Sequence, residues 1–296
     1  MLQRLDFDRD GADWPHREYS RFVSAGGLRW HVQQMGAGPA LLLVHGTGAS
    51  THSWGGLMPL LAEHFTVLAP DLPGHAFTDT PPAPRMSMAG MAADLALLLE
   101  ALAFKPRLAI GHSAGAAIVA TMSLAGSLAL DGAISLNGSM VPLRGVAGHV
   151  FSPLARLLAG TSWVPRWFAR RAAQPAVIRR LIGETGSVLD TNGLEYYRLL
   201  AGNSAHAAAV LNMMANWDLD GLVRDLPRLS PPLLQIVGGA DRTVPPADAE
   251  RVRELLPGAK TEILPGLGHL AHEEAPDTVA PLVLAFARGT GVLPAA

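Results

Sequence analysis

Short apolar runs alternate with amphipathic stretches along most of the chain. A short continuous apolar run bounded by glycine, proline or polar turns is typical of a strand buried on both faces of a parallel sheet. A longer stretch with apolar residues every three or four positions is typical of a helix packed on such a sheet. The pattern predicts strands at residues 21–25, 28–34, 39–44, 65–69, 108–110, 132–136, 233–237 and 261–264. It predicts helices at residues 54–64, 86–103, 114–124, 247–256 and 275–287.

The alternation stops between residues 139 and 226, where helical patterns continue but no strand pattern occurs. Strands that alternate with helices predict a mostly parallel sheet with helices on both faces and right-handed crossovers. We therefore expect an α/β core over residues 20–138 and 227–290, with a helical lid over residues 139–226 inserted after the sixth strand. Residues 1–19 are predicted to form a polar N-terminal extension.

Composition narrows the class of protein. The 296 residues are 49% hydrophobic and 16% charged, which suits one large α/β domain with an insertion. A net charge of −2 argues against general nucleic-acid binding, and the lack of cysteine excludes disulfides, thiolate metal sites and a cysteine nucleophile. The histidines show no metal-ligand spacing, so we expect neither a metal nor another cofactor. No signal core or spanning helix is predicted, and a cytoplasmic location is expected.

The most informative motif is Gly111-His112-Ser113-Ala114-Gly115, which follows a predicted strand and begins a predicted helix. A serine at such a sharp turn needs small neighbours, because strand and helix approach each other closely there. The turn lifts the serine to the carboxyl edge of the sheet, next to a helix N-terminus that favours developing negative charge. This arrangement predicts a nucleophile elbow with Ser113 as the nucleophile.

A serine nucleophile needs a base and an acid that orients the base. Asp241 follows the predicted strand at residues 233–237, and His269 follows the strand at residues 261–264 on a glycine-rich loop. The order Ser113, Asp241, His269 matches the chain order of Ser-acid-His hydrolases of the α/β class. Asp248 and His272 are weaker alternatives, since they are expected in or near the helices that follow.

The loop His45-Gly46-Thr47-Gly48 after the third strand predicts the rest of an oxyanion hole. Two backbone N–H groups are needed, and we assign them to Thr47 and Ala114. The alternative is a tight glycine-rich turn without a catalytic role. The remaining predicted pocket residues are His45, Gly46, Asn137, Met213, Met214 and Trp217.

The predicted lid is basic and apolar. No Asp or Glu lies between Asp131 and Glu184, and the same interval holds seven arginines interleaved with large apolar residues. A basic surface with exposed aromatic residues is typical of peripheral contact with an anionic membrane. Arginines can also hold the carboxylates of a large apolar ligand. The third interpretation is an ordinary lid whose arginine stems cover its apolar surface.

The elbow, the His-Gly-Thr-Gly loop, Asp241 and His269 resemble the α/β-hydrolase superfamily over about residues 20–290. Within it, the chain resembles the magnesium chelatase accessory proteins of bacteriochlorophyll biosynthesis in photosynthetic bacteria. That closer resemblance is carried by residues 13–15, 27–33, 45–54, 111–117, 135–138, 213–219 and 266–274. Ala76 departs from it, since glycine is usual at this position. Some α/β hydrolases place their acid at the end of the sixth strand, but Asn137 stands there and its amide cannot serve, which favours Asp241.

The resemblance implies a role near the insertion of Mg²⁺ into protoporphyrin IX, with magnesium chelatase subunits as partners and contact with the photosynthetic membrane. Three functions stay open on the sequence. The first is a Ser-His-Asp hydrolase acting on an ester or acyl bond of a small molecule such as a tetrapyrrole. The second is a porphyrin-binding carrier with an idle triad, and the third is a general carboxylesterase.

Overall fold

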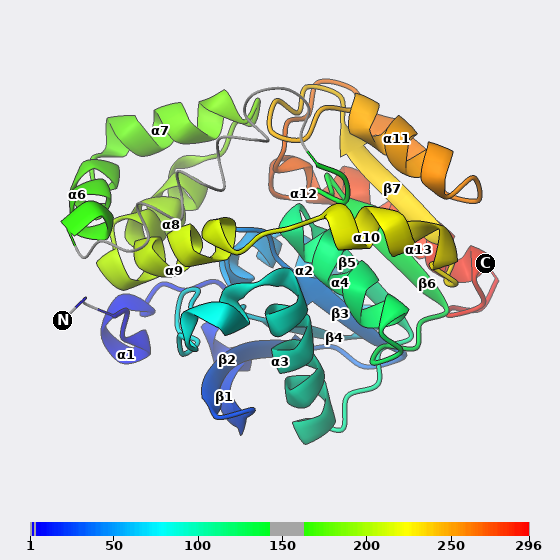
Figure 1. Cartoon of the computed structure of the whole chain (residues 1–296), viewed down its shortest axis with the longest axis horizontal. Coiled ribbons are helices and arrows are strands. Elements are labelled where there is room, and N and C mark those ends of the chain that lie inside the picture. The colour runs from blue at the N-terminus through cyan, green and yellow to red at the C-terminus, as the bar shows by residue number, and fades with distance from the viewer. Residues whose placement is uncertain (1, 3, 143–162, 296) are drawn as a thin grey trace.

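The computed structural model describes residues 2, 4–142 and 163–295, and its centre is one eight-stranded sheet (Figure 1). The strand order is β1-β2-β4-β3-β5-β6-β7-β8. β1 and β2 pair with each other in antiparallel fashion, β2 also runs antiparallel to β4, and the pairs from β4 to β8 are parallel. The strands are β1 (Ser20–Ala25), β2 (Leu28–Met35), β3 (Ala40–Val44), β4 (Thr66–Pro70), β5 (Leu108–His112), β6 (Gly132–Leu136), β7 (Leu233–Gly238) and β8 (Lys260–Leu264). The predicted mostly parallel α/β sheet is confirmed.

Helices cover both faces of the sheet, because the central strands are apolar on both sides. On one face, α3 (Met88–Ala101) and α4 (Ala114–Leu124) pack into a core cluster with β3, β5 and β6, to which α11 (Ala247–Leu255) adds Val252. On the other face, α2 (Leu57–Ala62) and α13 (Pro276–Gly289) form a second cluster. The helix expected from residue 54 begins only at Leu57, because Thr51–Trp54 form a separate turn of 3-10 helix.

Helices follow β6 in the region predicted to form the lid. They are α6 (Trp163–Ala172), α7 (Pro175–Glu184), α8 (Thr191–Ala201), α9 (Ser204–Ala215) and α10 (Asp220–Asp225). The first part of the predicted lid, residues 143–162, lies outside the described residues. Figure 1 shows α6 to α9 grouped on one side of the molecule, beside the carboxyl ends of the parallel strands.

The N-terminal extension is anchored where the sheet domain meets these helices. After the short helix α1 (Phe7–Asp10), Trp14 is buried and donates a hydrogen bond from Nε1 to Thr51 Oγ1 at 3.0 Å. Its ring also meets the ring of Tyr196 in α8, with 5.5 Å between centroids. The extension therefore joins the sheet domain to the helices above it. Within the described residues, none of the helices has the length and apolar character needed to span a membrane.

Candidate active site

Ser113 lies at the turn between β5 and α4 in a backbone conformation that side chains rarely adopt, with φ 52° and ψ −118°. The turn closes because its neighbours lack side chains. A Cβ on Gly111 would lie 2.4 Å from backbone atoms of Ala116, and one on Gly115 would lie 2.1 Å from the Val44 carbonyl oxygen. The two glycines of the motif are thus required by close backbone contact, as the elbow prediction assumed.

Backbone hydrogen bonds hold Ser113 at the carboxyl edge of the sheet. Its N–H donates to the Leu136 carbonyl at 3.1 Å, and its carbonyl accepts from the Ser139 N–H at 3.0 Å. Ser113 is the N-cap residue of α4, and the first backbone amides of a helix lack intrahelical hydrogen-bond partners. A negative charge that develops beside Ser113 would face these amides, that of Ala114 first.

Asp241 and His269 are brought together at the ends of β7 and β8. His269 Nδ1 and Asp241 Oδ2 lie 2.8 Å apart, and both residues are buried. The other carboxylate oxygen of Asp241 accepts from the N–H groups of Thr243 and Val244 at 2.7 and 2.9 Å. Three donors therefore hold the carboxylate in the orientation that fixes the His269 ring, if the His269 Nδ1 carries the proton.

Asn137 supplies a fourth contact to this carboxylate. It follows β6 with a positive φ of 47°, and its Nδ2 donates to Asp241 Oδ2 at 2.8 Å and to the Gly268 carbonyl at 3.3 Å. The amide that cannot act as an acid thus bridges the loop of Asp241 to the loop of His269. The sequence predicts Asn137 as a pocket residue. Its position at a strand end is the only sequence signal for its contact with Asp241.

The His269 loop lies directly beside the elbow. His112 Nε2 donates to the His269 carbonyl at 2.9 Å, and the two rings are 4.9 Å apart. Burial lowers the pKa of His112 well below its ordinary value, so this histidine is neutral and donates its hydrogen bond to the His269 loop. Among the described residues, the Ser113 hydroxyl has no hydrogen-bond partner; bonds of this kind often tighten only when substrate binds.

The segment that follows α7 closes around the same loops. The Thr185 carbonyl accepts from the Arg242 N–H at 3.1 Å, and Ser187 Oγ accepts from the Leu270 N–H at 2.8 Å. The Glu274 carboxylate accepts from the N–H groups of Gly268 and Val188 at 2.9 and 3.2 Å. The middle of the predicted lid, residues 185–188, therefore holds the loops of Asp241 and His269 in place, a contact that no sequence motif indicated.

Asp248 and His272, the weaker candidates for the acid and the base, contact other residues. Asp248 lies in α11 and forms an ion pair with Arg251 at 2.9 Å. His272 lies in α12 (Ala271–Glu274), where its Nε2 is 2.8 Å from Ser53 Oγ, and burial lowers its pKa to about 3. Neither residue contacts Ser113 or the His269–Asp241 pair through a hydrogen bond.

The loop of residues 45–48 lies against the nucleophile. A Cβ on Gly46 would be 2.9 Å from the Ser113 Cβ, which brings the Thr47 backbone close to the serine. His45 is occupied by the backbone: its Nε2 accepts from the Leu72 N–H at 2.9 Å and its Nδ1 donates to the Gly46 carbonyl. Burial lowers its pKa to about 3, so it is neutral and shapes the loop.

Of the three predicted pocket residues on the lid side, one reaches this loop. The Thr47 hydroxyl lies 3.5 Å from the sulfur of Met213 in α9. Trp217 packs on the core cluster that includes α4, and Met214 is half-buried in α9. Among the described residues, no three His, Asp or Glu side chains are grouped as metal ligands.

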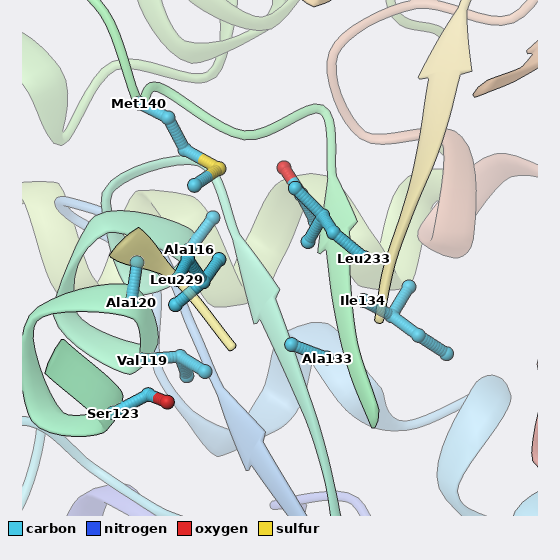
Figure 2. A pocket seen from close by; sticks show the side chains of 10 residues that line it. Ala116, Val119, Ala120, Ser123, Ala133, Ile134, Met140, Leu229 and Leu233 are labelled. Carbon is cyan, nitrogen blue, oxygen red and sulfur yellow. The ribbon is translucent and has the colours of Figure 1, made fainter. Parts of the chain in front are cut away.

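A separate apolar pocket lies beside α4. Figure 2 shows it between Ala116, Val119 and Ala120 of the helix, Ala133 and Ile134 of β6, and the Met140 side chain. Ser123, Ser135, Leu229 and Leu233 complete the lining. None of the predicted site residues lines this pocket.

Comparison with known proteins agrees with this geometry. Residues 41–282 match the model of the "Alpha/beta hydrolase family". The chain is 36% identical over 280 residues to the "Magnesium-chelatase 30 kDa subunit" of Rhodobacter capsulatus, covering 94% of this chain and 98% of that protein. A putative lipase from Acinetobacter baumannii has the same fold with a TM-score of 0.77 at 20% identity, covering 98% of each chain.

A solved α/β-hydrolase-fold protein from Burkholderia ambifaria is also similar, with a TM-score of 0.76 and 24% identity over 96% of this chain and all of its own. These likenesses agree with the strand order and the helices on both faces of the sheet. The chain belongs to the α/β hydrolase family.

Proposed function

We propose that this protein is a serine hydrolase that cleaves an ester or related acyl bond. The Ser113 oxygen attacks the acyl carbon while His269 takes the hydroxyl proton, and that proton then passes to the leaving oxygen as its bond to carbon breaks. Water repeats the sequence on the acyl-serine and releases the acid. The hydrogen bond between His269 Nδ1 and Asp241, 2.8 Å long and beside the elbow, is the observation that carries the proposal.

In this mechanism Asp241 orients the His269 ring and stabilises its charged form. The backbone N–H groups of Thr47 and Ala114 receive the negative charge that develops on the acyl oxygen. Support comes from the position of the 45–48 loop against Ser113 and from the free amides at the start of α4. No cofactor is required by these steps.

We place this activity in bacteriochlorophyll biosynthesis, accessory to the insertion of Mg²⁺ into protoporphyrin IX. The support is the 36% identity, over nearly the whole chain, to a protein named as a magnesium-chelatase subunit. A tetrapyrrole is flat and apolar and carries carboxylates, which suits a lid with arginines and without acids up to Glu184. The proposed partners are therefore a tetrapyrrole substrate and subunits of the chelatase.

A fluorophosphonate probe tests the nucleophile before any substrate is known. The probe should label the wild type and the Ser123→Ala variant, which removes another serine at the far end of α4, and should fail to label Ser113→Ala. Absence of labelling in the wild type would contradict the hydrolase proposal. Labelling that survives in Ser113→Ala would contradict the choice of nucleophile.

A porphyrin carrier with an idle triad is the second candidate, favoured by the Ser113 hydroxyl having no hydrogen-bond partner among the described residues. Complementation of a pigment-deficient strain separates the two functions. The hydrolase proposal predicts that Ser113→Ala fails to restore pigment, whereas the carrier predicts that it succeeds. Saturable quenching of protein fluorescence by protoporphyrin IX is expected for both, and its absence would count against a tetrapyrrole ligand.

A further inference from the structure

Helix α6 exposes its largest apolar side chains. Trp163 and Trp167 are 65% and 59% exposed, and their spacing of four residues places them on one side of the helix. The opposite side is buried and consists of small or medium residues: Val164, Pro165, Ala169 and Ala172. Amphipathic helices normally bury their bulkiest apolar residues, so this distribution indicates that the outward side contacts something else.

Exposed arginines occur on the same helix as the two tryptophans and on the next helix. Arg170 and Arg171 are exposed in the last turn of α6, and Arg179 is exposed in α7. Within the described part of the chain, these three form no ion pair with a carboxylate. Arg180 is paired with Glu184, and both side chains of that pair are largely exposed. The surface therefore presents several positive charges with little compensation from its own residues.

We propose that this surface docks the protein on the anionic face of a lipid bilayer. The docking surface, named the α6 face, consists of Trp163, Arg166, Trp167, Arg170 and Arg171. Indole rings prefer the headgroup region, since they combine a large apolar body with a polar N–H. Arginines on the same helix attract anionic headgroups, and no carboxylate on this helix opposes them. The inference does not depend on the proposed hydrolase activity.

The charge pattern favours a bilayer over a folded protein partner. Tryptophan and arginine also occur in protein interfaces, but there the anchoring side chains fill pockets and the centre of the interface is depleted of charge. The α6 face instead alternates aromatic and cationic side chains on the outer side of one helix. Figure 1 shows α6 at the edge of the molecule, on the side away from β7.

The inner side of the same helices lies near the candidate site. Ala172 of α6 packs in one cluster with Ile178 and Ile182 of α7 and with Leu270, the residue after His269. Helix α9, which also contacts α6, carries the Met213 that meets Thr47. Docking through the α6 face would therefore place the candidate site close to the bilayer, where apolar substrates concentrate.

Vesicle binding tests the proposal on the full-length protein. We expect it to sediment with vesicles of phosphatidylcholine mixed with phosphatidylglycerol, to stay in solution with phosphatidylcholine alone, and to be released by high salt. Binding should shift tryptophan emission to shorter wavelengths, because Trp14, Trp30 and Trp54 are already buried in the free protein.

Two double variants probe the α6 face. Arg170→Glu with Arg171→Glu should lower vesicle partitioning at least about tenfold, and Trp163→Ser with Trp167→Ser should abolish the emission shift. The matched controls are Arg224→Glu with Arg253→Glu in α10 and α11, and Ile263→Ser, which removes a side chain 56% exposed on β8. The controls should bind as the wild type does.

Folding is not expected to interfere, because all substituted side chains are exposed, and thermal unfolding of each variant verifies this. The proposal is overturned if the wild type does not bind anionic vesicles, or if the controls lose binding as strongly as the α6 variants. It is also overturned if the α6 variants lose binding to a purified chelatase subunit while their vesicle binding is unchanged. That last result would identify a protein partner.

Discussion

The two halves of the candidate site are held in different ways. On the nucleophile side, the sequence requirement lies within two residues of Ser113, since Gly111 and Gly115 allow the backbones of Ala116 and Val44 to come close. On the acid–histidine side, Asp241 and His269 depend on groups far away in the sequence, including Asn137 and the lid residues Thr185 and Ser187. The elbow therefore depends on a local sequence motif, whereas the positions of Asp241 and His269 depend on tertiary contacts.

The largest expected effect comes from the acid–histidine side. Asp241→Asn should lower the rate constant of fluorophosphonate labelling by about 10³ to 10⁴, because an amide no longer selects the His269 tautomer that accepts the serine proton. The side-chain oxygen of asparagine can still accept from the Thr243 and Val244 N–H groups, but its amide nitrogen would face the Asn137 Nδ2 donor, so we also expect a loss of about 1–3 kcal/mol in the free energy of unfolding. Labelling at the wild-type rate would contradict the role assigned to Asp241.

Asn137→Ala is the matched control on the same carboxylate. It removes one hydrogen bond of 2.8 Å and leaves the two backbone donors and His269 in place. A hydrogen bond to a charged group is worth about 1.5 kcal/mol, so labelling should slow by about tenfold. A loss as large as that of Asp241→Asn would mean that Asn137 does more than position the acid.

A substitution in the elbow should lower the stability of the protein. In Gly115→Ala, the added Cβ would lie 2.1 Å from the Val44 carbonyl oxygen and 2.8 Å from that of His45. Backbone atoms cannot move aside cheaply, so we expect the free energy of unfolding to fall by about 3 kcal/mol in urea titrations. The control, Gly183→Ala in α7, meets nothing within 4 Å and should gain about 0.5–1 kcal/mol. Equal midpoints for the two variants would contradict the close-contact argument.

The same difference explains what the sequence could predict. The elbow can be predicted because the residues that it requires are five consecutive positions of the sequence. The alternation of strands and helices can be predicted from apolar runs of strand length. Asp241 and His269 were proposed from their positions just after strands. The bridging role of Asn137, the contacts of Ser187 and the late start of α2 were missed, because partners separated by many residues leave no local pattern.

The buried carboxyl of Glu273 should make a smaller contribution, to the pH dependence of stability. Glu273 accepts hydrogen bonds from Ser53 and from Tyr197 of α8, and its side chain is only 8% exposed. Burial raises its pKa to about 7 from an ordinary 4.5, despite those hydrogen bonds, which lower it. Between these pH values the Glu273 side chain binds more protons in the folded protein than in the unfolded chain, so its contribution to stability falls as pH rises through the window and levels off above it.

Glu273→Gln should remove that slope, which amounts to about 2–3 kcal/mol across the window. Thermal or urea unfolding at pH 5 and pH 8 measures it, with Glu254→Gln on the exposed side of α11 as the control that keeps it. A change in stability between the two pH values that is the same in the wild type and in Glu273→Gln would contradict the raised pKa. Labelling by the probe should keep its own pH dependence in Glu273→Gln, since Glu273 does not contact Asp241 or His269.

The smallest expected effect tests the lid contact itself. Ser187→Ala leaves the buried Leu270 N–H without its acceptor at 2.8 Å, which should lower the free energy of unfolding by about 1 kcal/mol. Because Leu270 follows His269, labelling should slow as well, whereas Ser127→Ala at the end of α4 should affect neither measurement. If labelling is unchanged while stability falls, the lid only braces the fold. If both change together, the positions of Asp241 and His269 depend on the predicted lid, whereas the elbow depends on the glycines of its own motif.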